Sequence, residues 1–243
     1  MRPTTPAWRI TLAFATVYLV WGSTYLAIRY AIGSIPPFLM AGVRLSIAGG
    51  ILYLWARSRG AAPPTRSEWR AAAISGGLML VCGNGAVVWS EQVVPSGLTA
   101  LLVGLVPAWT VIVEWFLPGG AAPRGPTFLG LLAGLVGVGL LAGPGSVTGG
   151  ASPWAAGVLA LGSLAWSIGT IYQHRGAPRP SSSSMATGIQ MLAGGAGLLI
   201  LFLAVPHAGR FDLAAVSSRS LLALGYLIVF GSIITFSAFV GLL

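Results

Sequence analysis

Eight long apolar stretches, almost free of charge, account for most of this 243-residue chain. A helix needs about 20 apolar residues to cross the hydrocarbon core of a bilayer, and each stretch is close to that length. Charged residues make up only 7% of the chain, far below the share in a soluble domain. Backbone polar groups cannot stay unpaired in lipid, so the sequence predicts an all-α integral membrane protein. We expect spans at 10–29, 37–56, 71–92, 97–117, 126–143, 154–173, 184–205 and 220–243.

Arginines are concentrated in one set of the short loops between these spans. The net charge of +9 would suggest nucleic-acid binding in a soluble protein. Scattered through loops, the arginines instead follow the positive-inside rule, so we expect a lipid bilayer around the chain and no nucleic-acid partner. The rich loops carry Arg2, Arg9, Arg57, Arg59, Arg66, Arg70, Arg124, Arg175 and Arg179, and the opposite loops only Arg210 and Arg219. The sequence therefore predicts a cytoplasmic N-terminus.

Two parts of the chain resemble each other at a spacing of about 145 residues. The matched segments are 19–25 with 164–170, 48–50 with 193–195 and, after a slip of one residue, 42–44 with 188–190. A second copy that starts after five crossings is inserted upside down, as in the inverted repeats of secondary transporters. We expect residues 1–150 to form the first five-helix repeat and residues 151–243 to form three helices of the second. By this count the chain is truncated, with eight of ten transmembrane helices present.

Glycine and proline inside the spans predict local features of the helices. Gly130, Gly134, Gly137 and Gly139 recur in the fifth span. Small residues let membrane helices approach closely, so we expect a packing face there. Pro107 removes one backbone hydrogen bond from the fourth span, which predicts a kink.

Catalytic and metal-binding motifs are not found in the sequence. It contains neither His-Glu-x-x-His nor a pair of intramembrane aspartates, and its two histidines, His174 and His207, lie near span ends. Metal binding needs several donors that converge. We expect no catalytic residue, no metal and no cofactor.

Charged side chains inside the spans are the first candidates for function, because they are costly in a membrane. Arg44 lies about seven residues, or ~10 Å of helix rise, inside the outer end of the second span. Arg29 ends the first span and Glu91 nearly ends the third, at similar heights. One interpretation is an ion pair of Glu91 with Arg44 or Arg29. Arg44 could instead line the external half of a cavity, or snorkel to the interface.

Neutral polar and aromatic side chains complete the candidate site. Asn84, in the middle of the third span, suits an interhelical hydrogen bond and a substrate contact equally well. Trp21 and Tyr25 share one helix face, and the repeat relates Trp21 to Trp166. The predicted cavity residues are Trp21, Tyr25, Arg44, Asn84, Trp166 and Gln190. Glu114, near the inner end of the fourth span, is expected to pair with a cytoplasmic arginine.

Short motifs stand at characteristic places in most of the spans. They are Trp21-Gly22-Ser23-Thr24-Tyr25 with Arg29, Arg44, Pro95-Ser96-Gly97, Val106-Pro107-Ala108-Trp109, Leu129-Gly130 with Gly134 and Gly137-Val138, Trp166, Gln190 and Gly231-Ser232. Together they resemble the EamA-type branch of the drug/metabolite transporter superfamily. The resemblance implies ten helices in two inverted repeats, in a bacterial inner membrane. It also implies transport, often export, of small metabolites, amino acids or drugs.

The residues and the resemblance together predict a non-enzymatic secondary transporter that exports such solutes by alternating access. A membrane scaffold or assembly subunit is the main alternative, and an intramembrane enzyme is the second. A bundle used only for packing should show small residues and no deep charge, so Arg44 and Asn84 argue against a scaffold. A small-molecule substrate is the expected partner, and the sequence is compatible with a homodimer.

Overall fold

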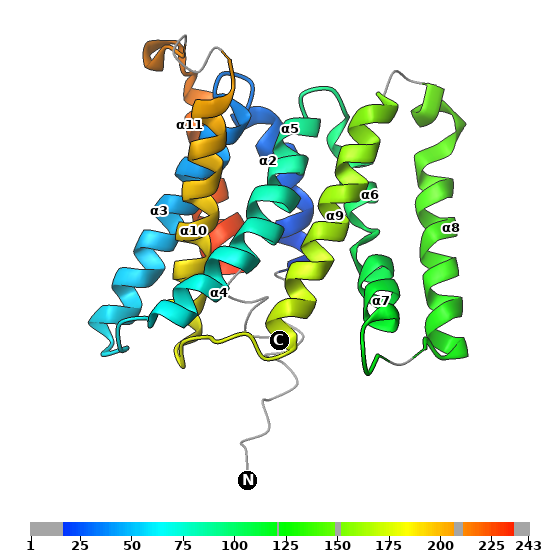
Figure 1. Ribbon diagram of the computed structural model, residues 1–243. Helices are drawn as coiled ribbons and strands as arrows, with labels where there is room; N and C mark the ends of the chain where they lie inside the picture. The colour runs from blue at the N-terminus through cyan, green and yellow to red at the C-terminus, as the bar shows by residue number, and fades with distance from the viewer. Residues whose placement is uncertain (1–16, 121, 149–151, 207–210, 236–243) are drawn as a thin grey trace. The chain divides into compact units, whose positions relative to one another are not determined.

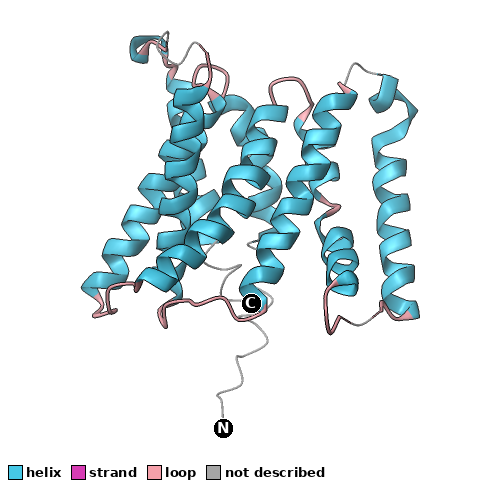
Figure 2. Ribbon diagram, in the orientation of Figure 1, coloured by secondary structure: helices cyan, strands magenta, loops and turns pink. Residues whose placement is uncertain are grey.

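Helices joined by short loops make up the part of the chain that the structure describes. This computed structural model describes residues 17–120, 122–148, 152–206 and 211–235, and no strand occurs among them (Figure 2). Every predicted span carries helix within these ranges. Five helices among them are long and apolar enough to cross a membrane: Pro37–Ser58, Arg66–Ser90, Ser96–Phe116, Pro153–His174 and Ser183–Ala204. The predicted all-α membrane fold is confirmed.

Contacts within the chain divide it into two compact units. One comprises Met1–Ala73 with Pro178–Leu243, and the other is Ile74–Ala177. We call them the first unit and the second unit. The expected repeat boundary near residue 150 is a boundary of sequence similarity rather than of compactness, and it stays a prediction.

The first unit combines helices from both ends of the chain (Figure 1). Its longest helices, α3 (Pro37–Ser58) and α10 (Ser183–Ala204), pack against each other. A π-helical turn, η1 (Val17–Trp21), leads into α2 (Gly22–Ala31). A short 3-10 turn, η4 (Leu213–Ala215), precedes α11 (Ser218–Tyr226), which continues into the π-helical segment η5 (Leu227–Ile234).

The second unit begins inside the third span. That span consists of α4 (Arg66–Gly76), the π-helical segment η2 (Gly77–Asn84) and α5 (Gly85–Ser90). The fourth span is divided into α6 (Ser96–Val103) and α7 (Val106–Phe116). The last two helices of the unit are α8 (Gly125–Thr148) and α9 (Pro153–His174).

Glycines let α3 and α10 approach until their backbones touch. A Cβ atom added at Gly49 would lie 2.8 Å from the carbonyl oxygen of Gly188, and one added at Gly188 would lie 3.1 Å from that of Gly49. Further along, a Cβ at Gly195 would lie 3.1 Å from the carbonyl oxygen of Gly42. No hydrophobic effect drives helices together in lipid, so close packing of this kind has to hold them.

These contacts are symmetric between the two repeats. Gly188 follows Gly42 by the same number of residues as Gly195 follows Gly49. Exchange of the two copies therefore turns the contact of Gly49 with Gly188 into that of Gly195 with Gly42. Both contacts are observed. This is the spacing that aligned 42–44 with 188–190, whereas the spacing of 145 residues that aligned 48–50 with 193–195 would match Gly49 with Gly194.

Two neighbouring contacts obey the same exchange. The Cβ position of Gly188 lies 2.9 Å from the backbone nitrogen of Tyr53, and that of Gly42 lies 3.1 Å from the backbone nitrogen of Leu199. Tyr53 and Leu199 are equivalent positions of the two copies in this register. Contacts of this kind follow from the antiparallel packing of α3 and α10, and the internal repeat stays a prediction.

Packing in the second unit centres on α9. Its Gly162 and Gly169 face the third span, since added Cβ atoms there would lie 2.5 Å from Cβ of Ala86 and 2.6 Å from Cγ of Met79. Two serines of α9 contact the fourth span. Ser163 donates a hydrogen bond to the carbonyl oxygen of Leu102 at 3.5 Å, and Ser167 donates one to the carbonyl oxygen of Val106 at 3.0 Å.

The predicted kink at Pro107 is confirmed as a break in the helix. α6 ends at Val103 and α7 begins at Val106, with Pro107 in its first turn. Pro107 has no N–H to bond the carbonyl oxygen of Val103, and a proline in the first turn is well tolerated. The carbonyl groups that accept hydrogen bonds from Ser163 and Ser167 lie on either side of this break.

The packing face expected on the fifth span is not seen at three of its four glycines, and the fourth, Gly139, lies outside the residues whose surroundings are described. Nothing among the described residues lies within 4 Å of an added Cβ at Gly130, Gly134 or Gly137. A glycine pattern shows where a helix can approach, but a contact also needs a partner helix at that face. In the described part of the chain, the glycines with close neighbours include those of α3, α10, η2 and α9.

Substitution of adjacent glycines in α3 tests the interface with α10. Gly49→Ala should lower the free energy of unfolding by about 1–3 kcal/mol, because its Cβ meets backbone atoms that cannot yield easily. Gly50→Ala is the matched control, since nothing lies within 4 Å of its Cβ position. Thermal unfolding of the purified chain in detergent measures both. Equal melting temperatures for the two variants would contradict the close approach.

Candidate functional site

Arg44 is buried in the first unit, in the second turn of α3. Only 6% of its surface is exposed. Its Nε donates a 2.7 Å hydrogen bond to Oγ of Ser232, which lies in η5. The bond links α3 to the last described helix of the chain and sets the orientation of the guanidinium group.

Gly231 makes room for that arrangement. A Cβ atom at this position would lie 3.3 Å from Nη2 of Arg44 and 2.9 Å from the methyl carbon of Thr24 in α2. The guanidinium group and α2 can therefore both approach η5 here. Gly231 and Ser232 belong to a π-helical segment, a distortion that occurs frequently at functional sites.

The charge of Arg44 is not balanced by a carboxylate of its own unit. Glu68 accepts hydrogen bonds from the backbone nitrogen and Oγ1 of Thr65. Asp212 accepts from the backbone nitrogen of Ala214 and lies exposed. The Nη1 atom of Arg44 is buried and has no hydrogen-bond partner among the described residues. A buried donor left in this state is destabilising, and a buried charge more so.

The first unit also holds Trp21, Tyr25, Arg29 and Gln190. Trp21 and Tyr25 are half-buried at the start of the first described span, and Arg29 is exposed at its end. Gln190 is buried in α10, at the position that corresponds to Arg44 in the repeat. A 2.6 Å hydrogen bond between Oγ of Ser23 and the hydroxyl of Tyr226 holds α2 against α11.

The remaining candidate residues belong to the second unit. Trp166 packs over Gly83, whose Cβ position lies 3.0 Å from Cε3 of the indole ring. Asn84 follows in the chain, and its side-chain nitrogen is buried with no hydrogen-bond partner among the described residues. Glu91 is fully buried at the end of α5.

The predicted site residues thus form two groups, one in each unit. The first is Trp21, Tyr25, Arg29, Arg44 and Gln190, and the second is Asn84, Glu91 and Trp166. A single cavity lined by residues of both groups stays a prediction, as does an ion pair of Glu91 with Arg44 or Arg29. Sequence reasoning missed Ser232 as the partner of Arg44. A hydroxyl side chain beside a glycine in an otherwise apolar span was the available signal.

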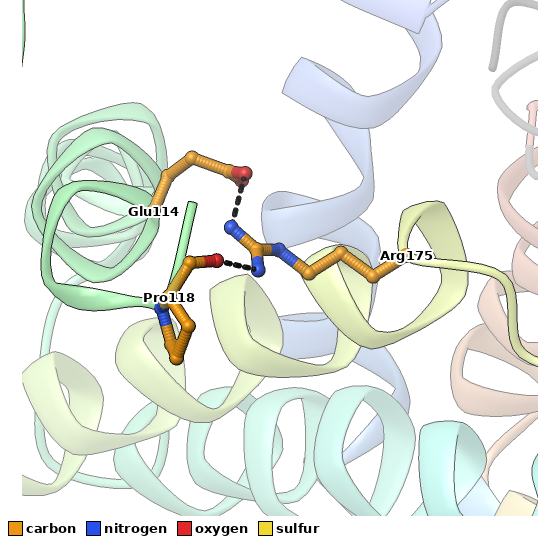
Figure 3. Close-up of polar contacts among 3 residues, drawn as sticks. All are labelled: Glu114, Pro118 and Arg175. Atoms are coloured by element: carbon orange, nitrogen blue, oxygen red, sulfur yellow. Dashed lines mark hydrogen bonds and ion pairs between the residues drawn. The ribbon is translucent and has the colours of Figure 1, made fainter. Parts of the chain in front are cut away.

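Glu114 has the partner that the sequence predicted. Its Oε1 lies 3.0 Å from Nη2 of Arg175, the residue after α9. The same guanidinium donates through Nη1 to the carbonyl oxygen of Pro118 at 2.9 Å (Figure 3). Both charged side chains are more than a third exposed, so this pair contributes little to stability. It fastens the end of α7 to the end of α9.

Histidine, cysteine and acidic side chains do not gather in the described part of the chain. No three of them come close enough there to hold a metal ion. Buried polar groups in that part of the chain include the guanidinium of Arg44 and the amide of Asn84.

Two of three relatives compared here with the chain are named as transporters. The chain is 38% identical to the inner membrane transporter YedA of Escherichia coli K12, over 95% of this chain and 73% of that protein. It is 28% identical to the transporter YvbV of Bacillus subtilis, over 80% of this chain and 63% of the relative. A chloroplastic WAT1-related protein of Arabidopsis thaliana is also 28% identical, over 91% of this chain and 54% of its own length.

A solved structure and a family model agree with the membership that these relatives indicate. One protein crystal structure superimposes with a TM-score of 0.65 at 20% identity, over 97% of this chain and 79% of the other, which shows a shared fold. The family model of the EamA-like transporter family matches residues 8–143. The buried polar residues therefore lie in a transporter bundle, and the chain belongs to the EamA-like transporter family.

Proposed function

We propose that this chain is a secondary transporter of a bacterial inner membrane that exports small metabolites, amino acids or drugs by alternating access. The observation that carries this mechanism is the backbone contact of α3 with α10, the second helix of each expected repeat, around Gly42, Gly49, Gly188 and Gly195. Inverted repeats allow a transporter to open to either side, because each half can adopt the conformation that the other half holds.

A second symmetric feature supports the same mechanism. η2 lies in the third span and η5 in the eighth, which are corresponding spans of the two repeats, and each is a π-helical segment of 8 residues. π-helical turns have poorer regularity than an α-helix and mark functional positions. They give each repeat a deformable region in the same place.

The substrate site in this proposal lies among the buried polar residues. Arg44 and Gln190 occupy equivalent positions of α3 and α10. Trp21, Tyr25, Asn84 and Trp166 supply the aromatic and amide groups of the cavity. Polar groups at membrane depth are costly, and transporters retain them where substrates pass. A scaffold that needed only close packing would be expected to use small residues rather than a buried guanidinium group.

Reporter fusions test the orientation that the proposal requires. Arg57, Arg59, Arg66 and Arg70 lie in or beside the loop after α3, so a reporter fused after Pro63 should behave as cytoplasmic. A reporter fused after Ser34, one span earlier, should behave as external. The reverse result for both fusions would place the N-terminus outside and reject the inside orientation.

Substitution of Arg44 tests the site. In proteoliposomes loaded with labelled amino acids, Arg44→Ala should reduce transport by about tenfold or more, since hydrogen bonds to a charged group are lost. Folded yield, measured by size-exclusion chromatography, should fall less than transport. Arg124→Ala removes the same charge from an exposed loop and serves as the control. If Arg44→Ala lowers yield and transport equally, Arg44 is structural and the site assignment fails.

A further inference from the structure

Four arginines lie at one end of the first unit, where α3 is joined to α4 (Figure 1). They are Arg57, Arg59, Arg66 and Arg70, and all four are exposed. Glu68 is the one acid between residues 57 and 70, and its carboxylate already accepts hydrogen bonds from Thr65. This end of the unit therefore carries an excess of positive charge on its surface.

Packing holds these charges in one place. Ala56 of α3 and Ala72 of α4 lie in one buried cluster, and Ala61 of the loop between the two helices packs against it. Arg66 and Arg70 are four residues apart, so they project from the same side of α4. The charges thus belong to a packed turn between two helices.

Arg59 differs from Arg57 in what its guanidinium group contacts. Nη1 of Arg57 donates a hydrogen bond to the carbonyl oxygen of Ala61, within the turn itself. The guanidinium carbon of Arg59 instead lies 4.4 Å from the ring centroid of Trp55. Stacking on an indole ring fixes a guanidinium group by one of its faces. The N–H groups at the edge of Arg59 can therefore bond an acceptor from outside the chain.

An exposed apolar row of α3 leads to this stacked pair. Ile47, Ile51, Leu54 and Trp55 are all exposed, and their spacing places them along one side of the helix. Ile47 and Arg59 are twelve residues apart, or ~18 Å of helix rise. One leaflet contributes about 15 Å to the hydrocarbon core of a bilayer. The row is therefore as long as the acyl chain and headgroup of one lipid.

From this arrangement we infer that the turn between α3 and α4 binds an anionic phospholipid. Arg59 holds the phosphate at the edge of its guanidinium group, and an acyl chain lies along Ile51 and Leu54. Trp55 lies between them at the membrane–water interface, where tryptophan is favoured. The site is separate from the buried polar residues, so the inference does not depend on transport.

The charge and shape of the surface favour this occupant. Arginine matches the oxygens of a phosphate through paired N–H···O bonds. A cluster of arginines beside a membrane helix attracts anionic headgroups, whereas a zwitterionic headgroup brings no net charge to balance the cluster. A free phosphate ion would neutralise charge but leave the apolar row without a partner. A lipid with a single negative charge satisfies both parts of the surface.

Lipid-induced stabilisation of the purified chain tests the inference. The melting temperature in a non-ionic detergent is followed with phosphatidylglycerol, with phosphatidylcholine of the same acyl chains and with inorganic phosphate, at constant ionic strength. A ligand that binds only the folded state raises the melting temperature. Phosphatidylglycerol should raise it more than the other two additions. No shift, an equal shift with phosphatidylcholine, or an equal shift with phosphate would overturn the inference.

Native mass spectrometry identifies the occupant of the apolar row. The chain released from detergent should carry phosphatidylglycerol as a monomer. A dimer that carries no lipid would show that a second copy of the chain covers this face, and would contradict lipid binding.

Variants locate the binding at Arg59. Arg59→Gln should weaken the affinity for phosphatidylglycerol by about fivefold, which corresponds to one arginine at an anionic surface. Arg219→Gln is the matched control, because Arg219 is also exposed and its guanidinium carbon lies 3.8 Å from the ring centroid of Tyr30. It lies outside the cluster, so its variant should keep the wild-type affinity. Unchanged affinity in Arg59→Gln, or equal losses in both variants, would reject the site.

Discussion

The close approach of α3 and α10 is the constraint on which the rest of the first unit depends. Four glycines bring the two backbones together, and any side chain at Gly49 or Gly188 would collide with backbone of the other helix. In lipid such contact replaces the hydrophobic effect as the force between helices. In the register of the expected repeat, the positions two residues beyond Gly42 and Gly188 correspond to each other.

Those corresponding positions carry different side chains on similar helices. One holds Arg44 and the other Gln190, and both side chains are buried. The repeat thus provides a common framework, while the charge occurs in one copy only. Function is carried by such local differences rather than by the fold itself. Arg44 donates a hydrogen bond to a hydroxyl group of η5, so a π-helical segment contacts the charge.

The sequence predicted the parts of this structure that depend on local physics. Helical spans follow from hydrophobic length, the break before Val106 follows from Pro107, and the partner of Glu114 follows from a nearby arginine-rich loop. Contacts that depend on tertiary packing could not be read in this way. Gly130 has no close neighbour among the described residues whereas Gly188 is close-packed, although both sit in glycine-rich apolar helices. Ser232 was likewise hidden, because its pairing with Arg44 depends on a π-helical turn.

Thiol labelling from the two sides of the membrane tests the central claim, that one site is reached alternately from each side. The single native cysteine is replaced by Cys82→Ser, and Ser232→Cys places a thiol of similar size beside Arg44. A membrane-impermeant thiol reagent is then added to right-side-out and to inside-out vesicles. Alternating access predicts that the thiol reacts in both preparations. Reaction in only one of them, or in neither, would contradict the account.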